Sequence, residues 1–283
     1  MHAIHRLTET SLEQIHGAFE DAFSEYEVKM SMPLERLAEM LKTRSYRADL
    51  SLGYFVEGSL VGFVLVGFRS IGSQNVCYDA GTGVIRSFQN QGIGDKLLEA
   101  LKGMLRDEGV ERFVLEVLVN NRAAQKLYEK HGFRRTRRLC CFEIPRRLSP
   151  VLPGQEFVVD QARSVLEGVS EARYNQFAPS WQNTLASYAQ VREKHVVRTL
   201  SLAEELIGYG IIHQERGGIL QIAVLPEYLR VQTVSVILGL LAESTEAEKL
   251  TFLNVESGSL LEEILLGIGF TRTVDQFEME LVL

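Results

Sequence analysis

The chain contains two segments of similar pattern, and this internal repeat limits its fold more than any single motif does. Residues 56–63 (VEGSLVGF) resemble residues 202–209 (LAEELIGY), and each pattern predicts a strand, a tight turn and a second strand. Further along, residues 83–85 (GVI) match residues 223–225 (AVL), and residues 130–133 (KHGF) match residues 267–270 (GIGF). The repeat predicts two α/β domains of one kind in tandem.

A proline-rich segment separates the two copies. Three of the six prolines lie within residues 145–154, where a fixed φ breaks regular pairing. We therefore expect a first domain at residues 1–147, a linker at 148–154 and a second domain at 155–283. In the first domain, apolar patterns predict strands near 3–7, 52–57, 60–68, 75–85, 112–118 and 136–144, and helices near 10–25, 33–43, 93–108 and 121–131.

A glycine-rich turn follows the predicted strand that ends near Val84. Residues 89–94 read Gln-Asn-Gln-Gly-Ile-Gly, and an amphipathic helical pattern begins directly after them. The first amides of a helix have no partner within it, and the helix dipole adds positive charge at that end. Gly92 and Gly94 leave the backbone open to a ligand. The turn therefore predicts a phosphate-binding site.

A second motif follows one helix and one strand later, in residues 121–133 (NRAAQKLYEKHGF). Together the two motifs resemble the GNAT superfamily of N-acyltransferases, most clearly over residues 52–144. The resemblance implies an α/β fold with a mixed sheet, built as two tandem GNAT-like domains, with acetyl-CoA as co-substrate and no metal. It also implies that the strands at Val84 and Glu116 are parallel neighbours that splay apart to admit the pantetheine arm.

The same resemblance assigns the cofactor contacts to a strand edge, the glycine turn and the helix that follows. The residues implied are Thr82, Gly83, Val84, Gln89, Asn90, Gln91, Gly92, Ile93, Gly94, Asp95, Asn121 and Tyr128. Asn121 has an alternative role as a helix N-cap. Asp95 could likewise cap a helix instead of contacting the cofactor. Gln89 and Asn90 stand where the family often has an arginine, so the anion would rely mainly on backbone amides.

Acyl transfer to an amine needs a base for the amine proton and an acid for the leaving thiolate. Tyr128 is the candidate acid, because a phenol with a pKa of about 10 keeps its proton at pH 7. Its alternative role is packing of the helix on the sheet. Glu116, at the end of a buried strand, and Asp79, on the strand leading to Val84, are rival candidate bases. Each is equally compatible with a hydrogen-bonded structural carboxylate.

The second half keeps the fold pattern and loses both motifs. An alignment through Val84 and Val224 places Leu229, Gln232 and Val234 at the positions of Gln89, Gly92 and Gly94. The match of Gly132 with Gly269 places Gly258 and Leu265 at the positions of Asn121 and Tyr128. A β-branched valine suits a phosphate turn poorly. We therefore expect a single active centre in the first half, with a degenerate second half that packs against it or walls the substrate site.

Charge is unevenly shared between the halves. Residues 1–150 hold 21 Lys and Arg against 19 Asp and Glu, whereas residues 151–283 hold 9 against 18. The acidic half argues against a nucleic-acid partner. The chain has no apolar run long enough for a transmembrane helix and no signal-peptide core at its first residues. Three cysteines are too few for a disulfide framework, so a cytoplasmic location is expected.

The leading interpretation is an N-acetyltransferase that moves an acetyl group from acetyl-CoA directly to a primary amine of a small molecule or peptide. The alternative is a catalytically silent module that binds or senses acyl-CoA. A scaffold of two decayed domains would have no need of a phosphate turn. A monomer that forms an internal pseudo-dimer and a homodimer are both compatible with the sequence.

Overall fold

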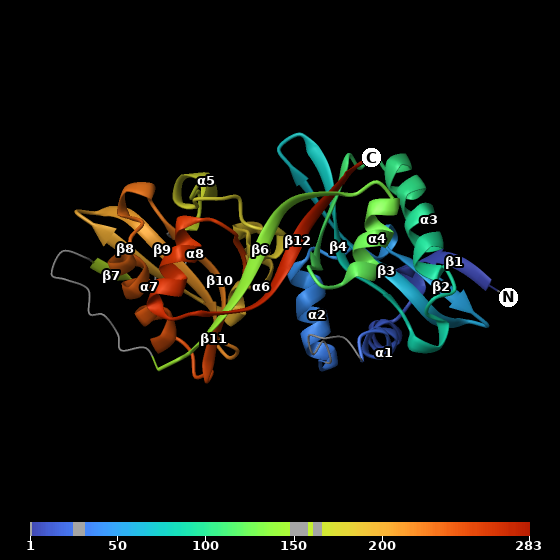
Figure 1. The fold of residues 1–283 in the computed structure, drawn as a ribbon, viewed down its shortest axis with the longest axis horizontal. Helices are drawn as coiled ribbons and strands as arrows, with labels where there is room; N and C mark the ends of the chain where they lie inside the picture. The colour runs from blue at the N-terminus through green and yellow to red at the C-terminus, as the bar shows by residue number, and fades with distance from the viewer. Residues whose placement is uncertain (1, 25–31, 148–157, 161–165) are drawn as a thin grey trace. The chain divides into compact units, whose positions relative to one another are not determined.

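The computed structural model describes residues 2–24, 32–147, 158–160 and 166–283 (Figure 1). These residues form two compact units, one made of Met1–Thr136 with Glu278–Leu283 and the other of Arg137–Phe277. Both units combine β-strands with helices, so the predicted α/β class is confirmed. The linker expected at residues 148–154 lies outside the described residues.

Unit 1 contains a mixed sheet with the strand order β1-β2-β3-β4-β5-β12. Its strands are β1 (His2–Arg6), β2 (Leu52–Val56), β3 (Ser59–Ile71), β4 (Gln74–Val84), β5 (Arg112–Leu118) and the last residues of β12 (Thr271–Val282). Its helices are α1 (Leu12–Ala22), α2 (Leu34–Thr43), α3 (Ile93–Asp107) and α4 (Arg122–Lys130). The strands and helices predicted up to residue 131 are all present, with ends within about three residues of those expected.

Two neighbouring residues of β3 show which helices cover each face of this sheet. A Cβ on Gly62 would lie 2.8 Å from Ile93 in α3. The ring of Phe63 instead stacks on Phe19 of α1, with centroids 6.0 Å apart. Successive side chains of a strand point to opposite faces. Helices α1 and α3 therefore cover opposite faces of the sheet.

Strands β4 and β5 pair in parallel over only part of their length. Paired residues run from Val76 with Arg112 to Tyr78 with Val114, although both strands continue well beyond this point. On its other side, β4 carries a β-bulge, since Val66 pairs with Asp79 and Leu65 with Gly81, leaving Ala80 extra. The expected parallel neighbours are confirmed, and their pairing ends where the expected gap begins.

Unit 2 repeats the element order of unit 1. Its sheet has the order β12-β6-β11-β10-β9-β8-β7, with β6 (Arg134–Pro145), β7 (Val158–Asp160), β8 (His195–Leu202), β9 (Glu205–His213), β10 (Gly218–Val224) and β11 (Lys249–Glu256). The helices are α5 (Glu171–Tyr174), α6 (Leu185–Val191), α7 (Val231–Glu243) and α8 (Leu260–Ile268). The hairpin, strand, helix, strand, helix and strand predicted from the repeat are therefore all present.

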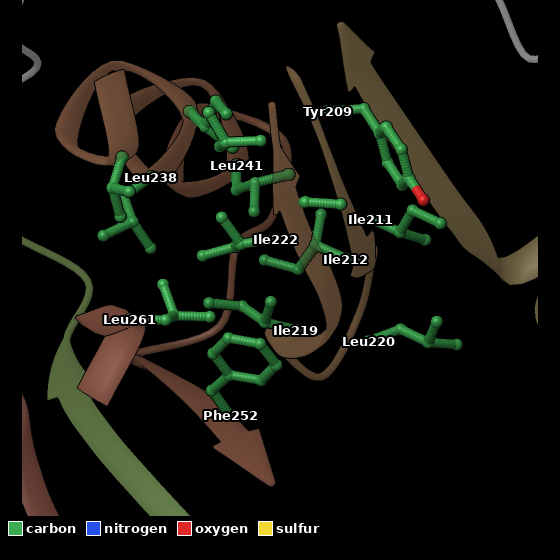
Figure 2. Packing of buried hydrophobic residues seen from close by; sticks show 14 of the residues in the cluster. Tyr209, Ile211, Ile212, Ile219, Leu220, Ile222, Leu238, Leu241, Phe252 and Leu261 are labelled. Carbon is green, nitrogen blue, oxygen red and sulfur yellow. The ribbon is translucent and has the colours of Figure 1, made fainter. Parts of the chain in front are cut away.

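A continuous apolar core holds the elements of unit 2 together (Figure 2). Tyr209 on β9 and Leu241 on α7 are fully buried in it. Gly210 lets α7 approach β9 closely, since a Cβ there would lie 2.6 Å from Ile237. Burial of aliphatic side chains at this density supplies most of the stability of such a unit.

Strands β6 and β12 each contribute residues to both units. The first three residues of β6 belong to unit 1 and the rest to unit 2, whereas β12 belongs to unit 2 until residue 277 and then to unit 1. In unit 1, Arg112 on β5 forms two 2.7 Å bonds to Glu280. The two compact units thus divide at residues 136/137 and 277/278.

Candidate active site

A cavity of about 580 Å³ opens in unit 1 where β4 and β5 have stopped pairing. Eleven of the residues expected to form the site line it, namely Thr82, Gly83, Val84, Gln89, Asn90, Gly92, Ile93, Gly94, Asp95, Asn121 and Tyr128. Ala22 and Phe23 at the end of α1 complete one wall. The volume lies within the range of about 300–1,000 Å³ that is usual for small-molecule and cofactor sites.

The glycine turn that lines the cavity leads directly into α3. Gly92 is the N-cap and has a φ of 73°, a left-handed conformation that a side chain would strain. Gly94 serves a different purpose, since a Cβ there would lie 3.2 Å from Leu127 of α4. The first backbone bond of the helix runs from the Lys96 amide to the Gly92 carbonyl, at 3.1 Å. The preceding amides of the turn form the kind of cradle that binds phosphate.

The two glutamines of the turn bond to its own backbone. Gln89 donates through Nε2 to the Val84 carbonyl at 3.1 Å, and Gln91 donates to the Ser87 carbonyl at 3.3 Å. Gln91 does not line the main cavity. It lies in a smaller one of about 310 Å³, together with Lys96 and Tyr54. The side chains of Gln89 and Gln91 therefore stabilise the turn.

Tyr128 also lines the cavity and is hydrogen-bonded to Asp79. Its Oη is 3.0 Å from Asp79 Oδ2, and its ring meets that of Phe133 edge-on at 5.5 Å. The buried Asp79 carboxylate also accepts bonds from Thr82 Oγ1 at 2.6 Å and the Gly81 amide at 2.9 Å. Burial raises the pKa of Asp79 above its ordinary value of 3.8, and these hydrogen bonds oppose the rise.

Glu116 lies on the other face of the sheet from Asp79. It accepts a short hydrogen bond from the Tyr78 hydroxyl, and burial raises the pKa of Tyr78 well above 10.0. The Arg44 guanidinium covers the Tyr78 ring at 5.9 Å and donates to the Ala80 carbonyl at 2.7 Å. Tyr78 and Asp79 are consecutive residues of β4. The two candidate bases thus occupy opposite faces, and neither lines the cavity.

Helix α4 is positioned by two polar side chains, one of which we did not predict. Asn121 is the N-cap, and its Oδ1 accepts from the Ala124 amide at 3.0 Å. Gln125 is buried and donates to the carbonyls of Leu118 and Val119, both at 2.8 Å. Gln125 therefore ties the helix to the end of β5. A polar residue four positions after Asn121, on the same helix face, was the available signal.

The corresponding region of unit 2 has a different turn. Helix α7 begins with Arg230 as its N-cap, six residues after Val224, whereas Gly92 follows Val84 by eight. The predicted match of Gly92 with Gln232 is wrong, because the turn of unit 2 is two residues shorter and Arg230 is the equivalent of Gly92. At the end of the next helix the alignment is correct. Leu265 accepts from the Phe270 amide as Tyr128 does from Phe133, and it is buried.

In unit 2 the gap between the parallel strands is spanned by a side chain of the same unit. Pairing of β10 with β11 stops at Ile219 and Phe252. Just beyond, Asn183 donates to the carbonyls of Leu220 on β10 and Leu253 on β11, at 2.7 and 3.3 Å. Asn183 is itself buried. The amide of Asn183 therefore bonds both strands where the second copy would have its own cleft.

Residues 12–133 match the family model of the Acetyltransferase (GNAT) family. Over these residues, which make up less than half of the chain, the protein is similar to a GNAT domain. GNAT enzymes use acetyl-CoA and act on amine acceptors such as proteins or small molecules. The chemistry of the lining suits a diphosphate-bearing thioester, since the turn offers backbone amides and the same cavity is lined by the strand edge at Thr82–Val84 and by Tyr128.

Two curated GNAT relatives match short segments of the chain. N-alpha-acetyltransferase 30 of Schizosaccharomyces pombe is 37% identical over 62 residues, which span 22% of this chain and 41% of that protein. GCN5-related N-acetyltransferase 6, chloroplastic, of Arabidopsis thaliana is 33% identical over 92 residues, or 30% of this chain and 32% of that protein. The matches thus span less than half the length of either relative.

A solved GNAT structure resembles the whole chain. A tandem GNAT protein from the clavulanic acid biosynthesis pathway aligns with a TM-score of 0.73 and 10% identity, covering 100% of this chain and 98% of its own. This likeness concerns the fold, and it agrees with two GNAT-like halves.

Among the described residues, no helix is long and apolar enough to cross a membrane, and no cluster of His, Cys, Asp or Glu could hold a metal ion.

Proposed function

We propose that this GNAT protein transfers the acetyl group of acetyl-CoA directly to a primary amine, at a single active centre in unit 1. The observation that carries the proposal is one cavity lined by both the αL glycine turn and Tyr128. A diphosphate bound at the turn would direct the thioester arm along Thr82–Val84 toward Tyr128. The acceptor would be an amine of a small molecule or peptide.

Tyr128 is the proposed general acid. Its helix is tied at both ends, by the Asn121 cap and by the backbone bond from the Phe133 amide to the Tyr128 carbonyl at 3.1 Å. The leaving thiolate requires a proton, and a phenol that is protonated at neutral pH can supply one. The bond to Asp79 fixes the direction of the hydroxyl, so Asp79 is proposed as a positioning residue for the acid.

Glu116 is the proposed base for the amine. It lies on the sheet face covered by α1, opposite the face on which Asp79 meets Tyr128. On opposite faces, the acid could protonate the leaving thiolate while the base takes the proton of the amine, so that the two groups do not exchange a proton with each other. Asp79 is a weaker candidate, because three donors already occupy its carboxylate.

Unit 2 is proposed to bind no acyl-CoA. It lacks a glycine in the turn at residues 225–234. It has Leu265 in place of the phenol, and its strand gap is spanned by Asn183. Its proposed roles are to stabilise unit 1 through the shared strands and to take part in an internal pseudo-dimer. A cytoplasmic location is proposed from the sequence alone.

Two assays on the full chain test this function. CoA should raise the thermal midpoint, and acetyl-CoA with a panel of primary amines should release free thiol. The three cysteines are buried, so they should react slowly with the thiol reagent. Stabilisation without thiol release from any amine would favour the silent binding module. Absence of both effects would contradict the proposal altogether.

A further inference from the structure

Asp95 places a negative charge beside the turn that is proposed to bind a diphosphate. It is the third residue of α3 and lines the same cavity as the glycine turn. An acidic residue in the first turn stabilises the helix through its dipole. The same carboxylate would repel an anion bound at that helix end. The negative charge of Asp95 thus stabilises the helix but would lower the affinity of the site for a diphosphate.

Two side chains at the end of α4 contact this carboxylate, the Lys130 ammonium and the His131 ring. Lys130 Nζ lies 2.6 Å and His131 Nε2 lies 2.9 Å from Asp95 Oδ1. His131 Nδ1 lies 3.4 Å from Glu99, which is one helical turn after Asp95 and also pairs with Lys102. Because Asp95 and Glu99 lie on the same face of α3, His131 stands between two carboxylates.

His131 is much more deeply buried than Asp95 and Lys130. The side chain of His131 is only 4% exposed, whereas those of Asp95 and Lys130 are 39% and 65% exposed. The Lys130 ammonium, and after it the His131 ring, holds the pKa of Asp95 below its usual value. Asp95 therefore stays ionised at neutral pH, and its charge is offset only by its partners.

We propose that the Lys130 ammonium offsets the charge of Asp95, with the His131 ring hydrogen-bonded to the same carboxylate, so that Asp95 can stabilise the start of α3 through the helix dipole without repelling the diphosphate of the cofactor. Both residues are positioning residues, since they act on the ligand through Asp95. The inference rests on the proposed function, because it requires acyl-CoA at the glycine turn. It explains why an acid is tolerated at a position that faces an anion.

Lys130 is the residue to vary, because its exposed side chain can be replaced with little risk to folding. The test compares Lys130→Gln, Asp95→Asn and the double variant by calorimetric titration with CoA. Lys126→Gln is the matched control, since it removes one exposed charge from the same helix at a position that does not line the cavity. Pantetheine, which lacks the diphosphate, serves as the uncharged ligand.

Lys130→Gln is expected to weaken CoA binding about fivefold, the effect of one partly screened charge at this range. In the Asp95→Asn background the same change should have little effect, and pantetheine binding should not change in any variant. These results would support the proposal.

Three results would overturn the inference while leaving the proposed function intact. One is an equal loss in Lys130→Gln and Lys126→Gln. Another is a loss that persists when Asp95 is already asparagine. The third is a parallel loss for pantetheine, which would show that the contact only holds the two helices together. Failure of the unaltered chain to bind CoA would instead contradict the proposed function, and the inference with it.

Discussion

Tyr128 donates a hydrogen bond to Asp79 across 3.0 Å, from helix α4 to the bulged end of strand β4. This contact joins two residues for which the sequence suggested opposite chemical roles. With its hydroxyl fixed by Asp79, Tyr128 keeps one orientation in the wall of the cavity. Asp79 in turn is surrounded by donors, which suits a structural carboxylate better than a base that must exchange protons.

Replacing Tyr128 with phenylalanine tests the acid. The variant should lose about a hundredfold or more in single-turnover rate, the usual range for loss of a general acid. Its CoA affinity should change little, because the phenol is proposed to act in the transition state. Rapid-quench measurement avoids masking by product release. An unaltered rate would leave Tyr128 with a packing role only.

Exchanging the two carboxylates for amides separates the candidate bases. Glu116→Gln should depress the rate and abolish the lower limb of its pH dependence, because an amide cannot titrate. Asp79→Asn should lower the rate without removing that limb. The opposite pattern would make Asp79 the base. If neither variant alters the profile, the amine arrives neutral or loses its proton to water.

The raised pKa of Asp79 predicts a pH-dependent stability. The folded state holds this proton more tightly than the unfolded chain, whose carboxyl titrates near 3.8. The contribution of Asp79 to stability is thus greatest below pH 3.8 and is lost as the pH rises through the folded value. Urea unfolding of the native chain and of Asp79→Asn should show their difference changing in this direction. A difference that is constant with pH would contradict it.

Removal of residues 278–283 should destabilise unit 1. This segment of β12 belongs to unit 1, where Glu280 bonds Arg112 and the Leu283 amide donates to Glu111 at 2.9 Å. Its loss would expose the edge of β5, the strand that carries Glu116. We expect a lower thermal midpoint and weaker CoA binding. Glu280→Gln, which removes one partly exposed ion pair, should cost only about 1 kcal/mol. A truncated chain with an unchanged midpoint would contradict this role.

Local sequence was sufficient to predict most elements of unit 1 and the turn. Helix α1 starts at a capping box in which Ser11 and Gln14 bond each other, and such signals are readable along the chain. The site residues near the turn follow one another in sequence, so one motif located most of the cavity wall. Gly94, however, is required for packing against Leu127, which no motif revealed.

Long-range partners could not be predicted in the same way. Nothing in the periodicity of β12 indicates that its end joins β5 in unit 1, because pairing partners depend on the whole sheet. Arg44 and Asn183 bind the carbonyls of Ala80 and Leu220, the extra residues of the two bulges. Neither contact follows from residue type.

Isothermal titration of the full chain with CoA counts its cofactor sites. One site per chain is predicted, because unit 1 has the αL glycine turn and the cavity beside it, whereas Asn183 spans the equivalent gap in the described part of unit 2. Gly92→Val combined with Gly94→Val should abolish that site, by straining a positive φ at one position and crowding α4 at the other. Two equivalent sites in the native chain, or binding that survives the double substitution, would contradict a single active centre in the first half.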